Sequence, residues 1–397
     1  MREMKDSGVR WIGKIPTKWT IAKAKNCVEI QNGSDPKTEG SIPVYGSGSM
    51  SFKTCGEYKE GPSVLIGRKG ATLHIPHYIS SKFWNVDTAF NVYSKSIFDL
   101  KYYFYCAHVF DYTLYMSQTT LPSMTQTAYE NMFLPLPTKE EQYAIANQLD
   151  QICSKIDAVL EKTRASIEEY KKLKQAIITQ AVTKGIRGDR PMKDSGIEWI
   201  GDIPAEWDVI RVKQLLKERN ERSKEGKEEP LSMSQKVGLV PTKFLESIPN
   251  MASSFVGAKL AYVDDLVFNK LKAHLGVFSV SRYDGLVSPD YAVYCSTGKS
   301  NLKYLEYIFK TPQCIGEFRK KSTGIAAGLM RLYTEGLFSI YLPYPALSEQ
   351  EEIAEYLNEK CAGIDALIVK KQQYLIEIEN YKKSLIYEYV TGKKEVV

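Results

Sequence analysis

Apolar residues recur at three- and four-residue steps from Thr138 to Lys184, a stretch without Pro or Gly. This spacing predicts one long amphipathic helix, because residues three and four positions apart share a helix face. About 45 residues at a rise of 1.5 Å each give a helix of roughly 65 Å, longer than a small globular domain needs. The predicted apolar seam consists of Ile145, Leu149, Ile152, Ile156, Val159, Tyr170, Leu173 and Ile177.

Local signals at both ends of this stretch agree with a helix. Thr138 and Glu141 have the spacing of a capping box, and Lys184 precedes Gly185, a residue typical of the position after a helix. Thr163 and Ser166 fall on the seam and weaken it in the middle.

The same pattern occurs again at the C-terminus. LPLPTKEEQYAIA at 134–146 corresponds to LPYPALSEQEEIA at 342–354, an offset of 208 residues. The seam positions transfer at this offset, although Lys360 and Lys371 fall on the second seam, and Ser348 with Glu351 is the expected cap. Two imperfect helices of matched length are expected to pair with each other, whereas two unrelated, solvent-exposed helices are the alternative.

A short motif is also repeated. MKDSGVRWIGKIPTKW at 4–19 and MKDSGIEWIGDIPAEW at 192–207 are identical at 11 of 16 positions, at an offset of 188 residues. The chain is therefore a tandem duplication, in which a motif, a divergent region and a long helix occur twice. The two Trp residues of each motif are expected to pack in a domain core.

The divergent regions have the same order of elements. Residues 20–133 contain short β segments separated by Gly, Pro and Ser, then a helix at 99–110, a polar loop and a strand. Residues 208–341 begin with a charged segment at 212–230 that we expect to be helical, and continue with strands and a helix at 302–324 broken by Pro312. The fold class is therefore α+β, with two globular domains and two long helices.

Composition limits the class of protein. The net charge is +6, and ten basic against nine acidic residues in 20–133 contrast with 20 against 14 in 208–340. This charge permits an anionic partner for the second region without requiring one. Seven scattered cysteines without a CxxC pair indicate a reducing cytoplasm, and no signal peptide or apolar run long enough for a membrane span is expected.

Motifs for catalysis are missing from the sequence. It has no phosphate-binding P-loop, no GxGxxG, no HExxH and no Asn-Pro-Pro-Tyr-type methyltransferase motif. His74 and His77 lack further ligands at metal spacing, so we expect neither a catalytic site nor a metal site. Glu57–Lys59 and Asp99–Lys101 match the E/D-x-K fragment of nucleases, and a stand-alone DNA nuclease with a coiled-coil dimerisation arm is the alternative function.

Three repeated features together resemble the specificity subunits of type I restriction–modification enzymes. They are the doubled D-S-G-x-x-W-I-G-x-I-P-x-x-W motif, the doubled L-P-x-P…E-Q…I-A start of a long helix, and the helix ends AVTKG and YVTGK. GPSVLIGRKG with VDTAF resembles the first recognition region of that family, and LSMSQKVGLVP with VSPDY resembles the second. The resemblance covers the full chain.

The resemblance implies a pseudo-two-fold tandem repeat. Residues 1–137 and 186–341 would be two target recognition domains, separated by two long antiparallel helices at 138–185 and 342–397 that form a coiled coil. Each domain would read one half of a bipartite, asymmetric double-stranded DNA sequence. The helices would set the spacer and dock two methyltransferase subunits, and restriction subunits would complete the complex. This chain would have no catalytic role, with S-adenosylmethionine, ATP and Mg²⁺ expected only on partner subunits.

Candidate DNA contacts are basic and small polar residues in turns, because Lys and Arg bind phosphates while Arg, Lys, Gln, Ser and Thr also bind base edges. An ordinary solvated surface side chain is the alternative for each of them. The candidates are Arg68, Lys69, Gln118, Thr119, Thr120, Lys270, Lys272, Lys320, Lys321, Ser322, Thr323 and Arg331.

Overall fold

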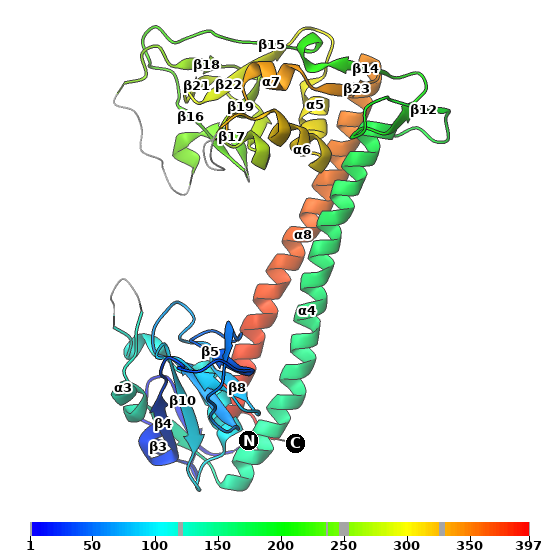
Figure 1. Cartoon of the computed structure of the whole chain (residues 1–397). Helices are drawn as coiled ribbons and strands as arrows, with labels where there is room; N and C mark the ends of the chain where they lie inside the picture. Colours follow the sequence, from blue (N-terminus) through cyan, green and yellow to red (C-terminus); the bar gives the residue numbers. More distant parts are fainter. Residues whose placement is uncertain (1, 118–121, 236, 246–253, 325–329, 397) are drawn as a thin grey trace. The chain divides into compact units, whose positions relative to one another are not determined.

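The computed structural model describes residues 2–117, 122–235, 237–245, 254–324 and 330–396. The chain divides into two compact units (Figure 1). Unit 1 contains Met1–Ala165 together with Lys371–Val397, and unit 2 contains Ser166–Lys370. Each unit therefore combines a globular part with a section of both long helices.

A four-stranded antiparallel sheet forms the centre of unit 1, with the strand order β4-β10-β7-β8. These strands are β4 (Val28–Asn32), β10 (Ala89–Ser94), β7 (Ser63–Gly67) and β8 (His77–Ile79). β7 is buried along its whole length, and helix α2 (Leu100–Val109) packs into the same core as the sheet. The helix predicted at 99–110 is thereby confirmed.

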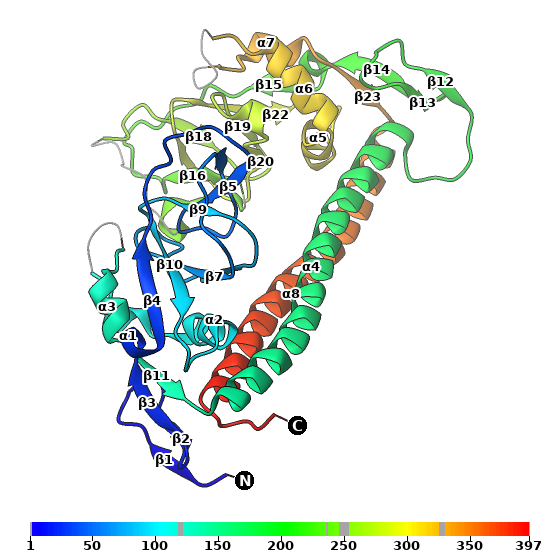
Figure 2. The ribbon, with the colours of Figure 1, turned by 60° about the horizontal axis from the view of Figure 1, so that its bottom comes forward.

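Smaller elements complete unit 1. Figure 2 shows β1 and β2 at one end of this unit and β5 and β9 at the other. The paired strands are β1 (Met4–Asp6) with β2 (Lys14–Pro16), β3 (Thr20–Lys23) with β11 (Phe133–Leu136), and β5 (Ile42–Tyr45) with both β6 (Lys53–Cys55) and β9 (Trp84–Asn85). The short helices are α1 (Ala24–Cys27), η1 (Tyr112–Leu114) and α3 (Gln126–Asn131).

Unit 2 repeats this plan. Its four-stranded sheet has the order β15-β22-β19-β20, made of β15 (Leu216–Glu218), β22 (Tyr291–Ser296), β19 (Leu266–Asn269) and β20 (Phe278–Val280). The other strands are β12 (Met192–Asp194) with β13 (Asp202–Pro204), β14 (Asp208–Arg211) with β23 (Tyr341–Tyr344), β16 (Leu231–Ser234) with β17 (Gly238–Pro241), and β18 (Lys259–Ala261) with β21 (Gly285–Val287). Its helices are η2 (Val212–Gln214), η3 (Thr242–Phe244), η4 (Ala273–Leu275), α5 (Leu302–Phe309), α6 (Pro312–Lys321) and α7 (Thr334–Phe338).

The strand order of the four-stranded sheet agrees between the units, although the smaller sheets differ, so the α+β tandem repeat predicted from the sequence is confirmed. The helix broken at Pro312 is also confirmed, because Pro312 is the first residue of α6. The helix expected at 212–230 is wrong. Only η2 forms there, and Leu215 and Leu216 are buried where β15 pairs with β22, so packing in the sheet prevails over the helical charge pattern.

The two long helices are α4 (Lys139–Lys184) and α8 (Leu347–Val390). The capping box of α4 is confirmed: the Glu141 N–H donates to Thr138 Oγ1, and the Thr138 N–H donates to the Glu141 carboxylate. The cap expected at Ser348 is wrong, because α8 begins at Leu347 and Ser348 lies inside its first turn.

Ion pairs connect α4 and α8 in antiparallel order within each unit. In unit 1, Lys382 Nζ lies 2.6 Å from Asp157 Oδ1, and Arg164 bonds Glu379 further along the pair. In unit 2, Lys174 Nζ lies 2.6 Å from Asp365 Oδ2. The two helices therefore pair with each other, as expected (Figure 1).

The seam predicted for α4 is confirmed at Ile145 and Leu149, which are 3% and 0% exposed, but further along the helix it is displaced. Val159 and Leu173 are 41% and 48% exposed, while the buried positions include Leu160, Thr163 and Ile167. Lys360, expected on the seam of α8, is exposed. Thr163 can be buried because its hydroxyl donates to the Val159 carbonyl at 2.8 Å, so the position that looked weak is part of the interface.

The repeated N-terminal motif anchors each globular part to the start of a long helix. Trp19 Nε1 donates to Glu141, which also pairs with Arg2. Trp207 Nε1 donates to Glu349 at 2.9 Å, and Glu349 pairs with Arg190. Both indole rings are almost fully buried, so the motif has a packing role.

Candidate nucleic-acid interface

Three segments of unit 1 meet at Arg68, the residue that follows β7. The Arg68 N–H donates to the Thr88 carbonyl at 2.8 Å, and the Arg68 carbonyl accepts the N–H of Met124 at 2.9 Å. Lys69 forms a β-bridge with Ser123. These backbone bonds fix the turn after β7 between the start of β10 and the segment that precedes α3.

The side chains of this turn differ in exposure. The Arg68 guanidinium lies 5.8 Å from the centre of the Phe90 ring and donates to the Asp87 carbonyl at 3.4 Å, so it is half-buried and held in one orientation. The Lys69 side chain is exposed. Gln118, Thr119 and Thr120 lie outside the described residues.

Unit 2 builds the same backbone frame at Lys270, the residue that follows β19. The Lys270 N–H donates to the Asp290 carbonyl at 3.2 Å, and the Lys270 carbonyl accepts the N–H of Leu332 at 3.0 Å. Thr323 and Arg331 exchange backbone hydrogen bonds of 3.0 and 2.9 Å. Lys270, Thr323 and Arg331 are therefore brought together, as Arg68, Lys69 and Ser123 are in unit 1.

Two basic side chains of this second frame are fixed by neighbours. Lys270 Nζ donates to the Pro289 carbonyl at 3.1 Å, and Arg331 Nη2 lies 3.2 Å from Asp290 Oδ1. The Nε of Arg331 is buried and has no hydrogen-bond partner among the residues that the structure describes. Lys272, at the start of η4, is exposed.

The remaining candidates lie at the end of α6. Lys320 Nζ bonds Glu317 at 2.7 Å on the same helix, and this carboxylate raises the pKa of Lys320. Ser322 donates its hydroxyl to the Phe318 carbonyl at 2.7 Å, and Lys321 is exposed. These three residues are therefore close to the second frame in sequence, but two of them are engaged by their own helix.

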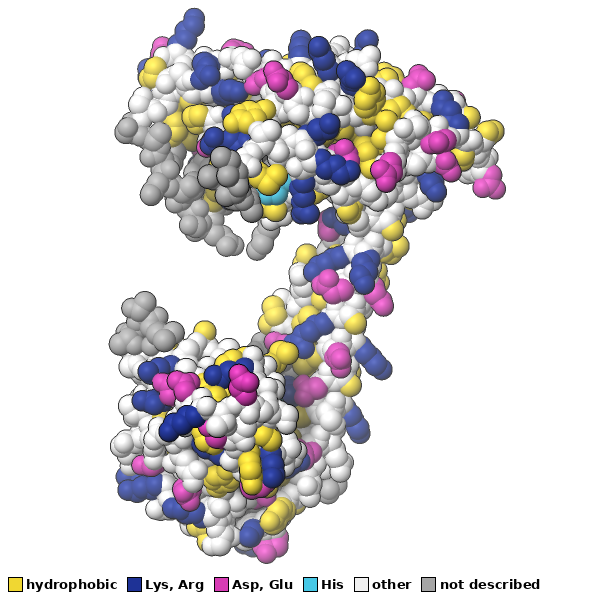
Figure 3. All heavy atoms as spheres, viewed as in Figure 1, with side chains coloured by type: hydrophobic (Ala, Val, Ile, Leu, Met, Phe, Trp, Pro, Cys, Tyr) yellow, Lys and Arg dark blue, Asp and Glu magenta, His cyan; other side chains and the backbone are white. Residues whose placement is uncertain are grey.

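Sequence reasoning missed the residues that clamp each frame. Thr88 and Asp290 supply the carbonyls that hold Arg68 and Lys270. Thr88 directly precedes β10, and Asp290 directly precedes β22. A signal was present in the VDTAF and VSPDY segments, which occupy the same place in the two repeats. Basic side chains on the visible face of each unit are otherwise dispersed among acidic ones (Figure 3).

The residues of the nuclease-like triplets have structural partners. Glu57 accepts hydrogen bonds from the Thr38 hydroxyl and from the Lys37 and Thr38 N–H groups, which lower its pKa to about 2. Lys59 Nζ donates to Asn32, Asn85 and Asn91, and burial lowers its pKa to about 8. No group of three or more potential metal ligands occurs among the described residues.

Asp99 of the second triplet caps α2 by accepting the Tyr102 N–H at 2.7 Å, and Lys101 pairs with Asp150 on α4. The two triplets are therefore built into the scaffold in different ways.

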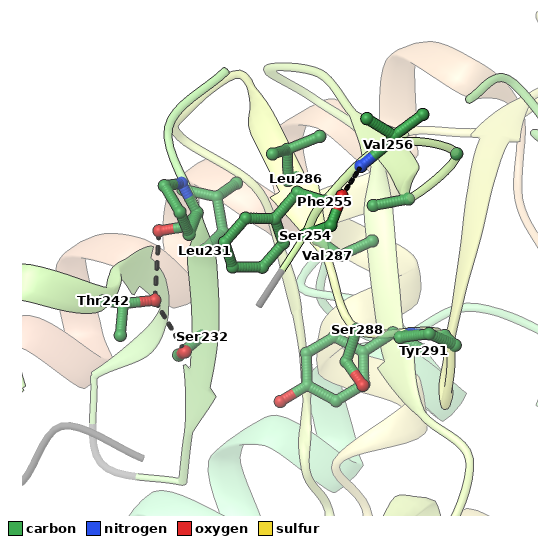
Figure 4. Close-up of a pocket in the computed structure, with 14 residues that line it drawn as sticks. Leu231, Ser232, Thr242, Ser254, Phe255, Val256, Leu286, Val287, Ser288 and Tyr291 are labelled. Carbon is green, nitrogen blue, oxygen red and sulfur yellow. Dashed lines mark hydrogen bonds between the residues drawn. The ribbon is translucent and has the colours of Figure 1, made fainter. Parts of the chain in front are cut away.

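A cavity of about 430 Å³ lies in unit 2 beside the second frame (Figure 4). Phe255, Leu231 and Val287 give it apolar walls, and Ser288 and Tyr291 line its lower side in this view. Its lining contains no charged side chain among the described residues. The cavity therefore offers van der Waals contacts and hydroxyl groups, without an acid–base pair.

Residues 16–169 match the family model of the type I restriction modification DNA specificity domain. The sequence is 26% identical over 296 residues to the type I restriction enzyme MjaVIII specificity subunit of Methanocaldococcus jannaschii, covering 70% of this chain and 66% of that protein. The putative type I restriction enzyme MjaX specificity subunit of the same organism is 28% identical, covering 69% and 62%. The chain therefore contains a match to this specificity domain at 16–169 and is similar to type I specificity subunits over about 70% of its length.

Solved structures of this family share the fold. A chain from a structure on complex assembly and conformational transition of a type I R-M system has a TM-score of 0.70 at 12% identity, covering 95% of this chain and 98% of that chain. The HsdS subunit from Thermoanaerobacter tengcongensis has a TM-score of 0.50 at 13% identity, with coverages of 96% and 98%. The resemblance and the fold class predicted from the sequence are confirmed, and the alternative of a stand-alone nuclease is not supported. No helix of the described residues is both long and apolar enough to cross a membrane.

Proposed function

We propose that this chain is the DNA-recognition subunit of a type I restriction–modification complex, in which each unit reads one half of a bipartite, asymmetric target. The observation that supports this most is the shared backbone frame. Arg68 in unit 1 and Lys270 in unit 2 are held by equivalent hydrogen bonds, yet the side chains around them differ. One scaffold with two sets of side chains suits the reading of two different half-sites.

Base reading in unit 1 would depend on Arg68. Its guanidinium is oriented by the Phe90 ring and the Asp87 carbonyl, so little rotamer entropy is lost when its other N–H groups bind a base edge. Lys69, which is exposed, suits a phosphate contact. In unit 2, Arg331 and Lys270 are similarly held for base contacts, and Lys272 suits a phosphate.

The chain itself would carry no catalytic step and no cofactor. S-adenosylmethionine, ATP and Mg²⁺ would be bound by two methyltransferase subunits and by restriction subunits in a cytoplasmic complex on DNA. Residues 1–137 and 186–341 remain the predicted recognition domains, with 138–185 and 342–397 as the conserved helices.

The long helices have features that fit docking and spacing. α8 leaves large apolar side chains exposed, among them Val369 at 61% and Ile376 at 53%, and a methyltransferase subunit would cover such a surface. α4 and α8 are continuous over 46 and 44 residues. A pair of continuous helices fixes phase as well as distance between two base-reading surfaces, so helix length would determine the number of unread base pairs.

Selection of bound sequences from random duplexes, with the full-length chain and variants, tests this proposal. Arg68→Ala is expected to relax base preference in one half of the selected motif, and Arg331→Ala in the other half. The loss of a bidentate contact corresponds to a reduction in discrimination of about 10- to 100-fold at that base. Exchange of residues 208–341 for those of a relative is expected to change one half only.

The control is Lys18→Ala, an exposed lysine between β2 and β3 at the far end of unit 1, which should leave the motif unchanged. If each arginine variant altered both halves of the motif, or if neither altered any position, the assignment of one half to each unit would be wrong.

A further inference from the structure

Two large apolar side chains are exposed on the turn between β5 and β6. Met50 is 82% exposed and Phe52 is 61% exposed, in the segment GSGSMSF that begins at Gly46. The turn is closed by the Phe52 N–H, which donates to the Val44 carbonyl at 3.1 Å. Apolar side chains in a Gly- and Ser-rich turn gain nothing from the fold, since they bury little of their surface there.

This turn lies directly against the frame that holds Arg68. Ser47 Oγ is 3.2 Å from Thr72 Oγ1 in the β7–β8 connection. A Cβ placed on Gly46 would lie 2.9 Å from Thr88 Oγ1 and 3.8 Å from the Phe52 ring. Since the Thr88 carbonyl accepts the N–H groups of Arg68 and Lys69, the apolar turn and the basic turn share Thr88 as a common neighbour.

Unit 2 repeats this arrangement with different residues. Val237, in the turn between β16 and β17, is 62% exposed. The same turn touches the β19–β20 connection, because Gln235 Nε2 donates to the Leu275 carbonyl at 3.0 Å, and the Leu275 side chain is 49% exposed. An exposed apolar turn therefore accompanies the basic frame in both units.

We propose that Met50 and Phe52 contact the bases of the half-site that unit 1 reads. This inference rests on the proposed function and adds an apolar specificity element to its basic ones. Lys53 Nζ lies 5.6 Å from the centre of the Phe52 ring, and Arg68 and Lys69 are bonded to Thr88, the neighbour of this turn. Basic groups attract the phosphates, while apolar groups find partners in thymine methyl groups and base faces.

Salt dependence distinguishes a base contact from a phosphate contact. A phosphate contact releases counterions and adds to the slope of log K against log salt, whereas an apolar base contact changes affinity without changing this slope. The experiment measures fluorescence anisotropy of the full-length chain on two duplexes, one with the motif obtained by selection and one scrambled, at several salt concentrations.

The double variant Met50→Ala/Phe52→Ala is expected to bind the selected duplex about tenfold more weakly, with an unchanged salt slope and unchanged binding to the scrambled duplex. Lys69→Ala is expected to lower the slope by about 1 and to weaken both duplexes alike. Ile97→Ala, which removes a side chain that is 50% exposed on the β10–α2 connection, serves as the matched control and should bind as the wild type.

Three results are decisive. Equal weakening on both duplexes, or a lower slope, would overturn the base contact. Unchanged affinity of the double variant would also overturn it, and would indicate that another protein covers this turn. If the wild type itself failed to prefer the selected duplex, the proposed function would fail first, which separates that outcome from failure of this inference.

Discussion

The repeated Trp–Glu–Arg clusters allow one prediction to be developed from matched sites. Glu349 is 4% exposed, and its carboxylate accepts from Trp207 Nε1 at 2.9 Å and from Arg190 Nη1 at 2.8 Å. Its counterpart Glu141 makes the same contacts with Trp19 and Arg2, but its side chain is 33% exposed. The same substitution therefore probes the same chemistry at two degrees of burial.

Glu349→Ala removes the buried carboxylate from Arg190, whose side chain is only 12% exposed and whose remaining carboxylate partner, Glu206, is exposed. The same change leaves Trp207 Nε1 without its acceptor, and Arg190 Nε has no partner among the described residues. Removal of one member of a buried ion pair costs about 3–5 kcal/mol of unfolding free energy. At Glu141, water can solvate the released arginine, so a loss of about 1 kcal/mol is expected. For a unit of about 200 residues, these values correspond to shifts in Tm of about 6–20 °C and about 2–4 °C.

The measurement is amide hydrogen exchange and thermal unfolding of the full-length variants, with exchange followed separately in the two units. Glu349→Ala is expected to accelerate exchange in unit 2 and to leave unit 1 as in the wild type. Arg190→Met/Glu349→Leu, which replaces both charges by apolar side chains, is the control and should recover most of the loss. Equal losses for Glu141→Ala and Glu349→Ala would refute the argument from burial.

Three other predictions concern the helices and the core of unit 1. Ile167→Ala removes a buried side chain from the α4–α8 seam and should lower the free energy of unfolding in denaturant by about 2–4 kcal/mol. Leu173→Ala, at a 48% exposed site, should change it by less than about 0.5 kcal/mol. A larger loss for Leu173→Ala than for Ile167→Ala would support the seam predicted from the sequence. Burial, with a contribution from the Lys382 charge, lowers the pKa of His108 to about 4, so the unfolded state binds more protons than the folded state between pH 4 and 6.5. The free energy of unfolding should therefore fall by about 2 kcal/mol from pH 7 to pH 5 and become independent of pH below 4. His108→Gln should remove this pH dependence in urea titrations. Tyr102 donates its hydroxyl to the Val390 carbonyl, and Tyr304 donates to the equivalent Val182 carbonyl. A chain of residues 1–188 should therefore dimerise, because the Val182 of one copy can replace Val390 in the other. Sedimentation equilibrium would detect the dimer, and a monomer would contradict the prediction.

The sequence was sufficient to predict the duplication, the two long helices and the order of elements in each unit, because these depend on local periodicity and on self-similarity. The register of the α4 seam was beyond it, since stripes one residue apart around a helix are nearly equivalent by composition. Leu160 and Ile167 are buried where Val159 and Leu173 were expected, while Thr163 lies on the seam with its hydroxyl bonded to a backbone carbonyl. The segment 212–230 was misjudged because β15 is stabilised by β22, whose paired residues lie 76 to 80 positions further along the chain.

The candidate interface was predicted in outline only. Loops rich in basic and small polar residues were visible in the sequence, and the structure brings Arg68, Lys69, Lys270, Thr323 and Arg331 into two frames. The clamping residues Thr88 and Asp290 act through backbone carbonyls, which any residue type supplies, so their identity carried little signal.

The composition of the two units has a consequence for synthesis of the chain. Unit 2 consists of Ser166–Lys370 alone, whereas the core of unit 1 includes Leu385, Ile386, Tyr389 and Val390 from the end of α8. A nascent chain can therefore complete unit 2 while the first 165 residues, already outside the ribosome, still lack part of their core. Domains usually fold in the order of their synthesis, but here the first unit must wait for the end of α8 to emerge. During that interval the incomplete core of unit 1 exposes hydrophobic surface, which makes the nascent chain prone to aggregation.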